Sequence, residues 1–144
     1  ITDFTGRQVT VSPRLALYAV KDFMGTELPG LAVILDDVTD PSEPEQYAVL
    51  TVSFGEFIGM KNCAYIDTNN CDFADQLQSQ GLASDTGFYK ASGFCQYPLW
   101  QFEEGTLREI DNDVYQKYSD AYDGYMASMY GDEPDEDGIQ EISL

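Results

Sequence analysis

Two β-rich runs on either side of a proline-broken acidic loop constrain the fold of this chain most. The runs are Leu31–Leu35 and Tyr47–Phe54, and both are rich in branched aliphatic and aromatic residues. The loop between them, residues 36–45, holds five carboxylates and two prolines, and proline interrupts both helices and sheet ladders. Two such runs joined by a short polar loop predict an antiparallel pair of strands.

Shorter strand patterns occur before and after this pair. Gln8–Val11 alternates polar and apolar residues, Ser12–Arg14 predicts a turn around a proline, and Leu15–Val20 predicts a second strand. The weaker patterns lie at Cys63–Ile66, Gly93–Gln96 and Leu99–Phe102. Because consecutive strands usually pair with each other, we expect a mostly antiparallel sheet.

Two helices are predicted, one short and one long. Asp67–Asn70 is dense in side chains that cap helix N-termini, and Gly81 is placed to end the short helix that follows. Apolar residues three or four apart predict a long helix over residues 111–130, and this stripe consists of Val114, Tyr118, Tyr122, Tyr125 and Met129. The stripe could stack on a ligand, but packing against the sheet is the preferred interpretation.

These elements predict the fold class and the domain limits. Residues 1–130 are expected to form a single α+β domain, with a mostly antiparallel sheet, one short central helix and one longer C-terminal helix packed on one face. A chain of 144 residues, 43% of them apolar, is long enough to bury roughly 70% of its unfolded surface. Residues 131–144 begin with Gly-Asp-Glu-Pro-Asp-Glu-Asp-Gly, so we predict a disordered acidic tail there.

The charge balance excludes several classes of partner. Twenty-six acidic residues, seven basic residues and no histidine give a net charge of −19. The bases are scattered singly, as Arg7, Arg14, Lys21, Lys61, Lys90, Arg108 and Lys117. Nucleic acids and anionic membranes both bind clusters of Lys and Arg, so direct binding to either is not expected. Solubility alone remains the simplest alternative explanation of the acidity.

Cysteine usage and hydropathy predict the compartment. Three cysteines, Cys63, Cys71 and Cys95, suit a reducing compartment or one bridge plus a free thiol, and buried structural thiols are the preferred interpretation. The sequence contains no run of about 18 apolar residues, so no transmembrane helix is predicted and a cytoplasmic location is expected.

The segment Asp67–Asp72 superficially resembles a calcium-binding loop, but Asp72 stands where such a loop needs glycine.

Catalytic arrangements are missing from the sequence. The lack of histidine excludes Ser-His and Cys-His nucleophiles. Neither a dinucleotide-binding glycine motif nor a P-loop is present. A carboxylate pair at glycosidase spacing carries no weight, because some pair among 26 acids always meets the distance. We therefore predict no catalytic residue, no metal site and no cofactor.

Two segments resemble the signature motifs of a known family. They are Asn62–Asn70 and Ser92–Leu99, and the stretches Gly81–Gly87 and Ala48–Val52 are similar as well. The family is the domain of unknown function numbered 4313, and the resemblance spans residues 45–103. It implies no activity and no functional residues, but it implies a setting on mobile elements of gut bacteria. The Tyr-rich helix and the acidic tail are expected to lie beyond the part that the family shares.

The distribution of charge leads to a functional hypothesis. Thirteen of the 26 acids lie within residues 103–141. We predict a non-enzymatic interaction protein that presents carboxylates to a basic surface on a partner and competes there with nucleic-acid phosphates. The candidate partner-binding residues are Glu103, Glu104, Glu109, Asp111, Asp113, Asp120 and Asp123. The sequence assigns neither the partner's identity nor an oligomeric state.

Two alternatives from other classes stay open. One is a metal-dependent or carboxylate-based hydrolase that uses Asp36, Asp37, Asp67 or Asp72. The other is a structural subunit of a larger assembly, which would need an exposed aromatic patch on the tyrosine stripe.

Overall fold

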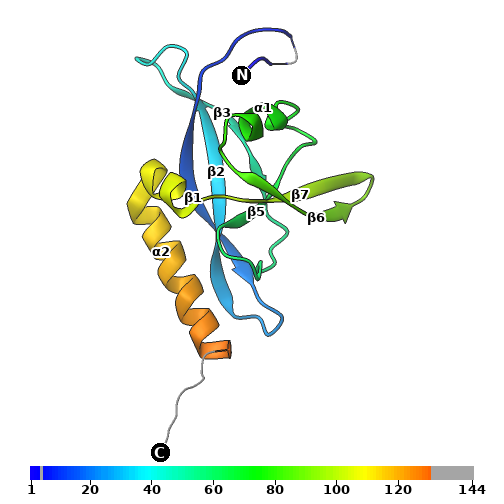
Figure 1. Ribbon diagram of the computed structural model, residues 1–144, viewed down its shortest axis with the longest axis vertical. Helices are drawn as coiled ribbons and strands as arrows, with labels where there is room; N and C mark the ends of the chain where they lie inside the picture. The colour runs from blue at the N-terminus through cyan, green and yellow to red at the C-terminus, as the bar shows by residue number, and fades with distance from the viewer. Residues whose placement is uncertain (4, 131–144) are drawn as a thin grey trace, which may run out of the picture.

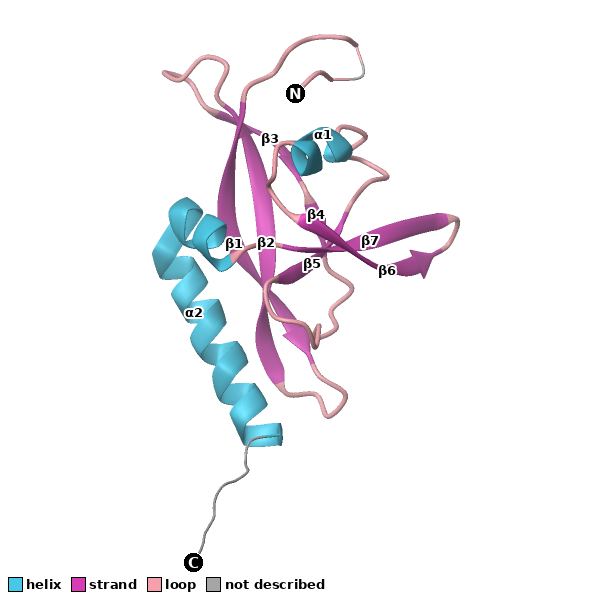
Figure 2. Ribbon diagram, viewed as in Figure 1, coloured by secondary structure: helices cyan, strands magenta, loops and turns pink. Residues whose placement is uncertain are grey.

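Two antiparallel sheets and two helices make up the computed structural model, which describes residues 1–3 and 5–130 (Figures 1 and 2). The elements are β1 Val11–Lys21, β2 Glu27–Asp37, β3 Glu45–Val49, β4 Thr51–Val52, β5 Cys63–Ile66, α1 Ala74–Ser79, β6 Ser84–Ser92, β7 Cys95–Gln101 and α2 Glu104–Tyr130. The strand orders are β1-β2-β3 and β4-β5-β7-β6. The α+β class is confirmed, with the strands divided between two sheets. The predicted tail, residues 131–144, lies outside the described residues.

The turn predicted at Ser12–Arg14 is wrong, because β1 runs continuously through it. Pro13 pairs with Leu35 inside an eleven-residue antiparallel hairpin with β2. β1 is the edge strand of its sheet. An edge strand tolerates proline because only one of its sides needs amide donors for the ladder.

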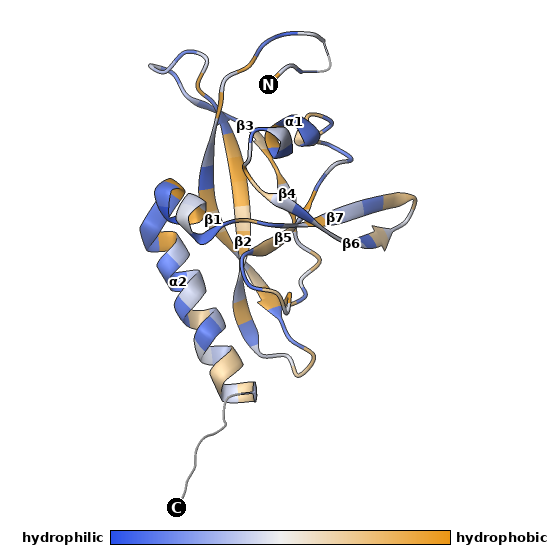
Figure 3. Ribbon diagram, in the orientation of Figure 1, coloured by the Kyte–Doolittle hydropathy of each residue, from blue (hydrophilic) through white to orange (hydrophobic). Residues whose placement is uncertain are grey.

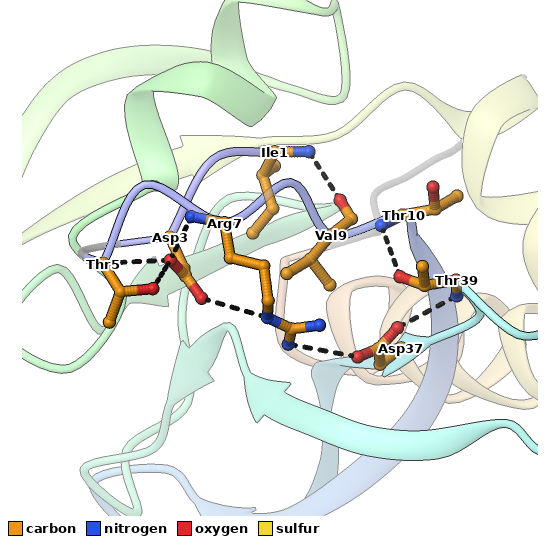
Figure 4. A network of polar contacts seen from close by, with 8 residues as sticks. All are labelled: Ile1, Asp3, Thr5, Arg7, Val9, Thr10, Asp37 and Thr39. Carbon is orange, nitrogen blue, oxygen red and sulfur yellow. Dashed lines mark hydrogen bonds and ion pairs between the residues drawn. The ribbon is translucent and has the colours of Figure 1, made fainter.

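The segment before β1 is held by polar contacts rather than by a sheet (Figure 4). The guanidinium of Arg7 lies between two carboxylates, 3.6 Å from Asp3 and 3.7 Å from Asp37. The strand predicted over Gln8–Val11 is therefore mostly wrong. Gln8 forms a single bridge with Thr2, and Val11 is the first residue of β1.

The run predicted as one strand over Tyr47–Phe54 changes sheet in its middle. β3 ends before Leu50 and β4 begins after it. Leu50 is completely buried; its amide donates to the Val33 carbonyl at 2.9 Å, and its carbonyl accepts from the Asp67 amide at 2.8 Å. The predicted antiparallel pairing of β2 with β3 is confirmed, while the end of the run joins the second sheet.

In the second sheet, β6 is the strand that the sequence does not predict. The strand at Cys63–Ile66 is confirmed as β5. The patterns at Gly93–Gln96 and Leu99–Phe102 merge into the single strand β7, which pairs with β6. None of the β6 side chains is fully buried, so β6 lacks the apolar alternation that marks a half-buried strand.

The C-terminus of α1 lies where the sequence predicts it, but the N-terminus does not. α1 begins at Ala74, later than Asp67–Asn70 predicts, and has no side-chain cap. Its C-terminus is confirmed. Gly81 has a φ of +85°, and the amide of Leu82 donates to the Leu77 carbonyl at 3.2 Å, which is the Schellman arrangement.

The long helix α2 begins before the predicted start and kinks at it. Asp111 has a non-helical backbone, with φ −161° and ψ 97°. Its carboxylate accepts a hydrogen bond from the Val114 amide at 3.1 Å. Asp111 is therefore the N-cap of the second helical segment, which explains why the sequence places a helix start there. Within the described residues, no helix is both long and apolar enough to cross a bilayer.

A single cluster of buried side chains connects both sheets and both helices. α2 packs against β1 and β2, and Figure 3 shows apolar residues gathered along β2 and polar residues along much of α2. The least exposed members of the cluster are Val33, Leu35, Leu50, Ile66, Cys71, Phe102, Leu107 and Tyr115. Residues from the two sheets and from α2 thus form one core, and this determines which face of α2 is buried and which faces solvent.

Candidate interaction surface

Two tyrosines on the inner face of α2 hold the helix in position. Tyr115 is completely buried, and its hydroxyl donates to Asn62 Oδ1 at 2.8 Å. The hydroxyl of Tyr118 accepts a hydrogen bond from the Asn62 amide at 2.9 Å. Asn62 has a φ of +65°, a left-handed conformation that asparagine adopts more readily than most residues. One residue just before β5 therefore positions two turns of α2.

The tyrosine stripe predicted from the sequence lies inside the monomer. Tyr118 and Tyr122 are buried, and Tyr125 is half-buried. Burial raises the pKa of Tyr118 well above its usual range, so the hydroxyl stays neutral and can keep its contact with Asn62. The packing interpretation of the stripe is confirmed. The structural-subunit alternative loses the exposed aromatic patch on which it depended.

Carboxylates lie on the opposite, outer face of α2. Asp113, Asp120 and Asp123 are exposed, and they are seven and three residues apart, a spacing that brings side chains to one helix face. A rise of 1.5 Å per residue separates the first two by about 10 Å along the axis. Lys117, also exposed, lies between them on the same face. The outer face is therefore acidic but not uniformly so.

Three of the seven predicted partner-binding carboxylates are engaged within the protein. Glu104 accepts from Arg108 at 2.8 Å, and Asp123 lies 2.9 Å from the ammonium of Lys61. The third is Asp111, whose carboxylate caps the second segment of α2. The structure thus assigns these three a local role in holding α2.

The other four are Glu103, Glu109, Asp113 and Asp120, and all are exposed. None of them forms an ion pair with a base in the part of the chain that the structure describes. Asp120 accepts one hydrogen bond, from the Gln116 side chain at 2.7 Å. We call Glu109, Asp113 and Asp120 the outer carboxylates of α2.

The density of these charges limits how closely α2 can imitate nucleic acid. Asp113 and Asp120, in the segment of α2 after the kink, lie about 10 Å apart along the axis, with Lys117 between them. Duplex DNA carries one charge per about 1.7 Å, or about six over the same length. The surface therefore suits a few well-separated basic side chains rather than a continuous phosphate-binding track.

Three of the four carboxylates of the hydrolase alternative, Asp36, Asp37 and Asp67, serve separate local contacts. Asp36 lies 3.0 Å from the guanidinium of Arg14. Asp67 accepts from the amide of Asn70 at 3.2 Å and from its side chain at 2.8 Å, so the segment that resembles a calcium loop closes a turn. Across residues 1–3 and 5–130, no group of three or more acids and cysteines is arranged to hold a metal ion.

The cysteines are free thiols, and two of them are buried. Burial raises the pKa of Cys63 and of Cys71 to about 11. Both are protonated at neutral pH and are therefore poor nucleophiles. Cys95 is partly buried and also free. The interpretation of Cys63 and Cys71 as structural thiols is supported.

A groove that the sequence does not predict lies between the tip of the β1–β2 hairpin and the end of α2. It has a volume of about 460 Å³ and is lined by Lys21, Asp22, Phe23, Glu56, Phe57, Tyr125 and Tyr130. The hydroxyl of Tyr125 donates to Asp22 Oδ2 at 2.6 Å. This bond raises the pKa of Tyr125 to about 12 and connects the helix to the hairpin.

One local signal could have located half of this groove. Asp22 and Gly25 bracket a turn between two apolar runs, and Gly25 has a φ of +81°, as many hairpin turns require. No local signal places that turn beside Tyr125, because the two segments are about a hundred residues apart in the chain.

The fold and this surface define the class of protein: a two-sheet α+β domain whose C-terminal helix buries tyrosines and exposes carboxylates. The chain belongs to the family described as Domain of unknown function (DUF4313), whose model matches residues 20–122. The match reaches well into α2, so the expectation that the family ends before the Tyr-rich helix is wrong. Comparisons with curated proteins and with solved structures gave no match.

Proposed function

We propose that this protein is an acidic interaction protein that binds a basic surface on a partner protein through α2. By occupying that surface it competes with nucleic-acid phosphates. The role is non-enzymatic and cytoplasmic, in a bacterium that carries the mobile element implied by the family resemblance. The observation that carries the proposal is the set of outer carboxylates, Glu109, Asp113 and Asp120, which are exposed on a rigidly held helix.

The surplus of negative charge supports this proposal. The bases that form ion pairs are Arg7, Arg14, Lys61, Lys90 and Arg108. With 26 acids against seven bases in the chain, most carboxylates have no base to pair with. Unpaired like charges repel one another and hold counterions, and a basic partner relieves both effects.

The rigidity of α2 supports it as well. The buried face is held by two hydrogen bonds to Asn62, and the exposed Asp123 adds an ion pair with Lys61. A side chain on a fixed helix loses less conformational freedom on binding than one on a mobile loop, so more of the interaction energy remains as affinity.

Affinity capture from a bacterial lysate, with the full chain as bait, tests the proposal. We expect a protein that handles DNA or RNA to be retained at low salt, released at high salt and displaced by added duplex DNA. The triple variant Glu109→Gln/Asp113→Asn/Asp120→Asn should lose most of this retention. Retention that is insensitive to both salt and DNA would contradict the proposal.

A matched control separates the position of the charges from their number. Glu43→Gln/Glu45→Gln/Asp72→Asn removes the same three charges at exposed positions away from α2. We expect this control to retain the partner nearly as well as the unmodified chain. Equal losses in both triple variants would show that net charge alone, rather than α2, attracts the partner.

A further inference from the structure

We propose that the groove between the β1–β2 hairpin tip and the end of α2 binds the guanidinium group of an arginine side chain. The inference deepens the proposed function, because it names the group on the basic partner that this chain would grip. It also stands on its own geometry, since the groove lies apart from the outer carboxylates. Four observations carry it.

Aromatic rings form much of the groove. The Phe57 and Tyr125 rings meet edge to face with centroids 4.8 Å apart. Phe23 and Tyr130 line the same groove and are 81% and 68% exposed. Exposed aromatic residues gathered around one groove are typical of binding surfaces. Ring faces attract cations, and arginine occupies such positions more often than lysine because its planar group stacks on them.

A fixed carboxylate lies among these rings. The Asp22 side chain accepts from the amides of Met24 at 2.9 Å and Thr26 at 2.8 Å, and from the Tyr125 hydroxyl at 2.6 Å. The Tyr125 hydrogen bond, helped by the two amides, lowers the pKa of Asp22 below its usual value despite partial desolvation. Asp22 therefore carries a full negative charge at neutral pH and holds the hairpin tip in one conformation.

The charges around the groove leave a negative balance. Lys21 also lines it, but lies opposite Glu27 in the β1–β2 register. Glu56 pairs with Lys90 at 2.6 Å. Together with Asp22, these are three carboxylates against two ammonium groups. The charges beside the groove therefore favour a cation.

The same chain already uses this type of contact elsewhere. The guanidinium carbon of Arg108 lies 4.8 Å from the Tyr115 ring centroid, and the Lys90 ammonium lies 5.3 Å from that of Phe54. These are the two cation–ring contacts formed within the described residues. Neither involves a ring of the groove.

Titration of the full chain with a short arginine peptide tests the inference. The probe is acetyl-Gly-Arg-Gly-amide, followed by the aromatic carbon–proton NMR signals of Phe57 and Tyr125. We expect saturable shifts of both signals. The same peptide with citrulline, which has nearly the same shape without the charge, should bind at least tenfold more weakly. Equal binding of the two peptides would overturn the proposal, and equal binding of a lysine peptide would overturn the preference for guanidinium.

Two exposed phenylalanines offer a matched pair of variants. Phe23→Ala removes a ring of the groove and should weaken arginine binding about two- to fivefold, the effect of a single exposed cation–ring contact. Phe94→Ala removes a fully exposed ring at the tip of the other hairpin, between β6 and β7, and should change nothing. Equal losses in both variants, or no loss in Phe23→Ala, would contradict the assignment.

The outcomes separate this inference from the proposed function. The α2 triple variant leaves the groove intact and should bind the arginine peptide normally. Peptide binding at the groove without capture of a basic partner would support the groove and contradict the proposed function. Capture that depends on the outer carboxylates, together with no shift of the Phe57 or Tyr125 signals, would support the proposed function and contradict arginine binding at the groove.

Discussion

The two faces of α2 are built from the same helix but are held by different forces. On the inner face, Tyr115 and Tyr118 are buried and bonded to Asn62. On the outer face, Asp113 is exposed and Asp120 makes a single hydrogen bond, to a neighbouring helix residue. Burial and buried hydrogen bonds stabilise a fold far more than exposed charges do. The inner face therefore determines stability, and the outer face is free to serve binding.

The largest effect is expected on the inner face, from Tyr118→Ala. This change removes a buried aromatic ring and leaves the Asn62 amide without its acceptor. We expect a loss of about 3–5 kcal/mol in the free energy of unfolding, measured by urea denaturation. Tyr118→Phe, which keeps the ring, should cost about 1–3 kcal/mol. Equal losses for the two variants would show that the hydroxyl, rather than ring packing, determines stability there.

A somewhat smaller effect is expected from Asn62→Gly. Glycine keeps the positive φ of this position, so the variant mainly removes the side chain that accepts from Tyr115. The buried hydroxyl then lacks a partner, at a cost of about 1–3 kcal/mol. In a double-mutant cycle, Asn62→Gly should cost much less when Tyr115→Phe is already present. Additive losses would mean that the hydrogen bond contributes nothing.

The cap at the kink of α2 should contribute less. Asp111→Ala removes the hydrogen bond to the Val114 amide and should cost about 1 kcal/mol in urea denaturation. Asp111→Asn keeps a capping oxygen and should lose only a fraction of that. If the two variants lose the same amount, the charge of Asp111 matters rather than its cap.

The contact between Asp22 and Tyr125 should make stability depend on pH at both extremes. The pKa of Asp22 is lowered in the folded state, so its contribution is present above the usual aspartate value of about 3.8 and is lost as the pH falls below it. The pKa of Tyr125 is raised to about 12, so its contribution is present below about 10 and is lost as the pH rises toward 12. Tyr125→Phe should flatten both changes in thermal melts across this range, and an unaltered pH profile would contradict the assignment.

The smallest effect on stability is expected on the outer face. Neutralising Glu109, Asp113 and Asp120 should each change the free energy of unfolding by no more than about 0.5 kcal/mol. Partner capture should nevertheless fall sharply, as proposed above. A loss of stability as large as that of the inner-face variants would show that the two faces are not separable.

Much of the fold is predictable where the signal is local. β5 follows from its apolar run, and the end of α1 follows from Gly81, whose positive φ suits glycine. Asp111 marked a helix start because a capping side chain next to an apolar stripe is a local signal, and the structure uses it as a cap. The inward position of the tyrosine stripe follows from its helical period in the same way.

The missed features depend on neighbours that the sequence does not identify. Pro13 fits within β1 only because β1 is an edge strand. β6 follows no alternating pattern because it packs little against the core. Among the carboxylates predicted to bind a partner, Glu104 and Asp123 are paired with bases. The partner of Asp123, Lys61, comes from a loop far away in the sequence.

The sequence by itself determined the negative charge, the lack of histidine chemistry and most of the segments that become strands and helices. Those properties depend on composition and on the nearest neighbours along the chain. Only the tertiary structure decided that Leu50 joins two sheets, that Asn62 positions α2 and that Asp22 meets Tyr125 in a groove. The physical reason is that burial and hydrogen bonding between distant segments arise only when the chain has folded around a common core.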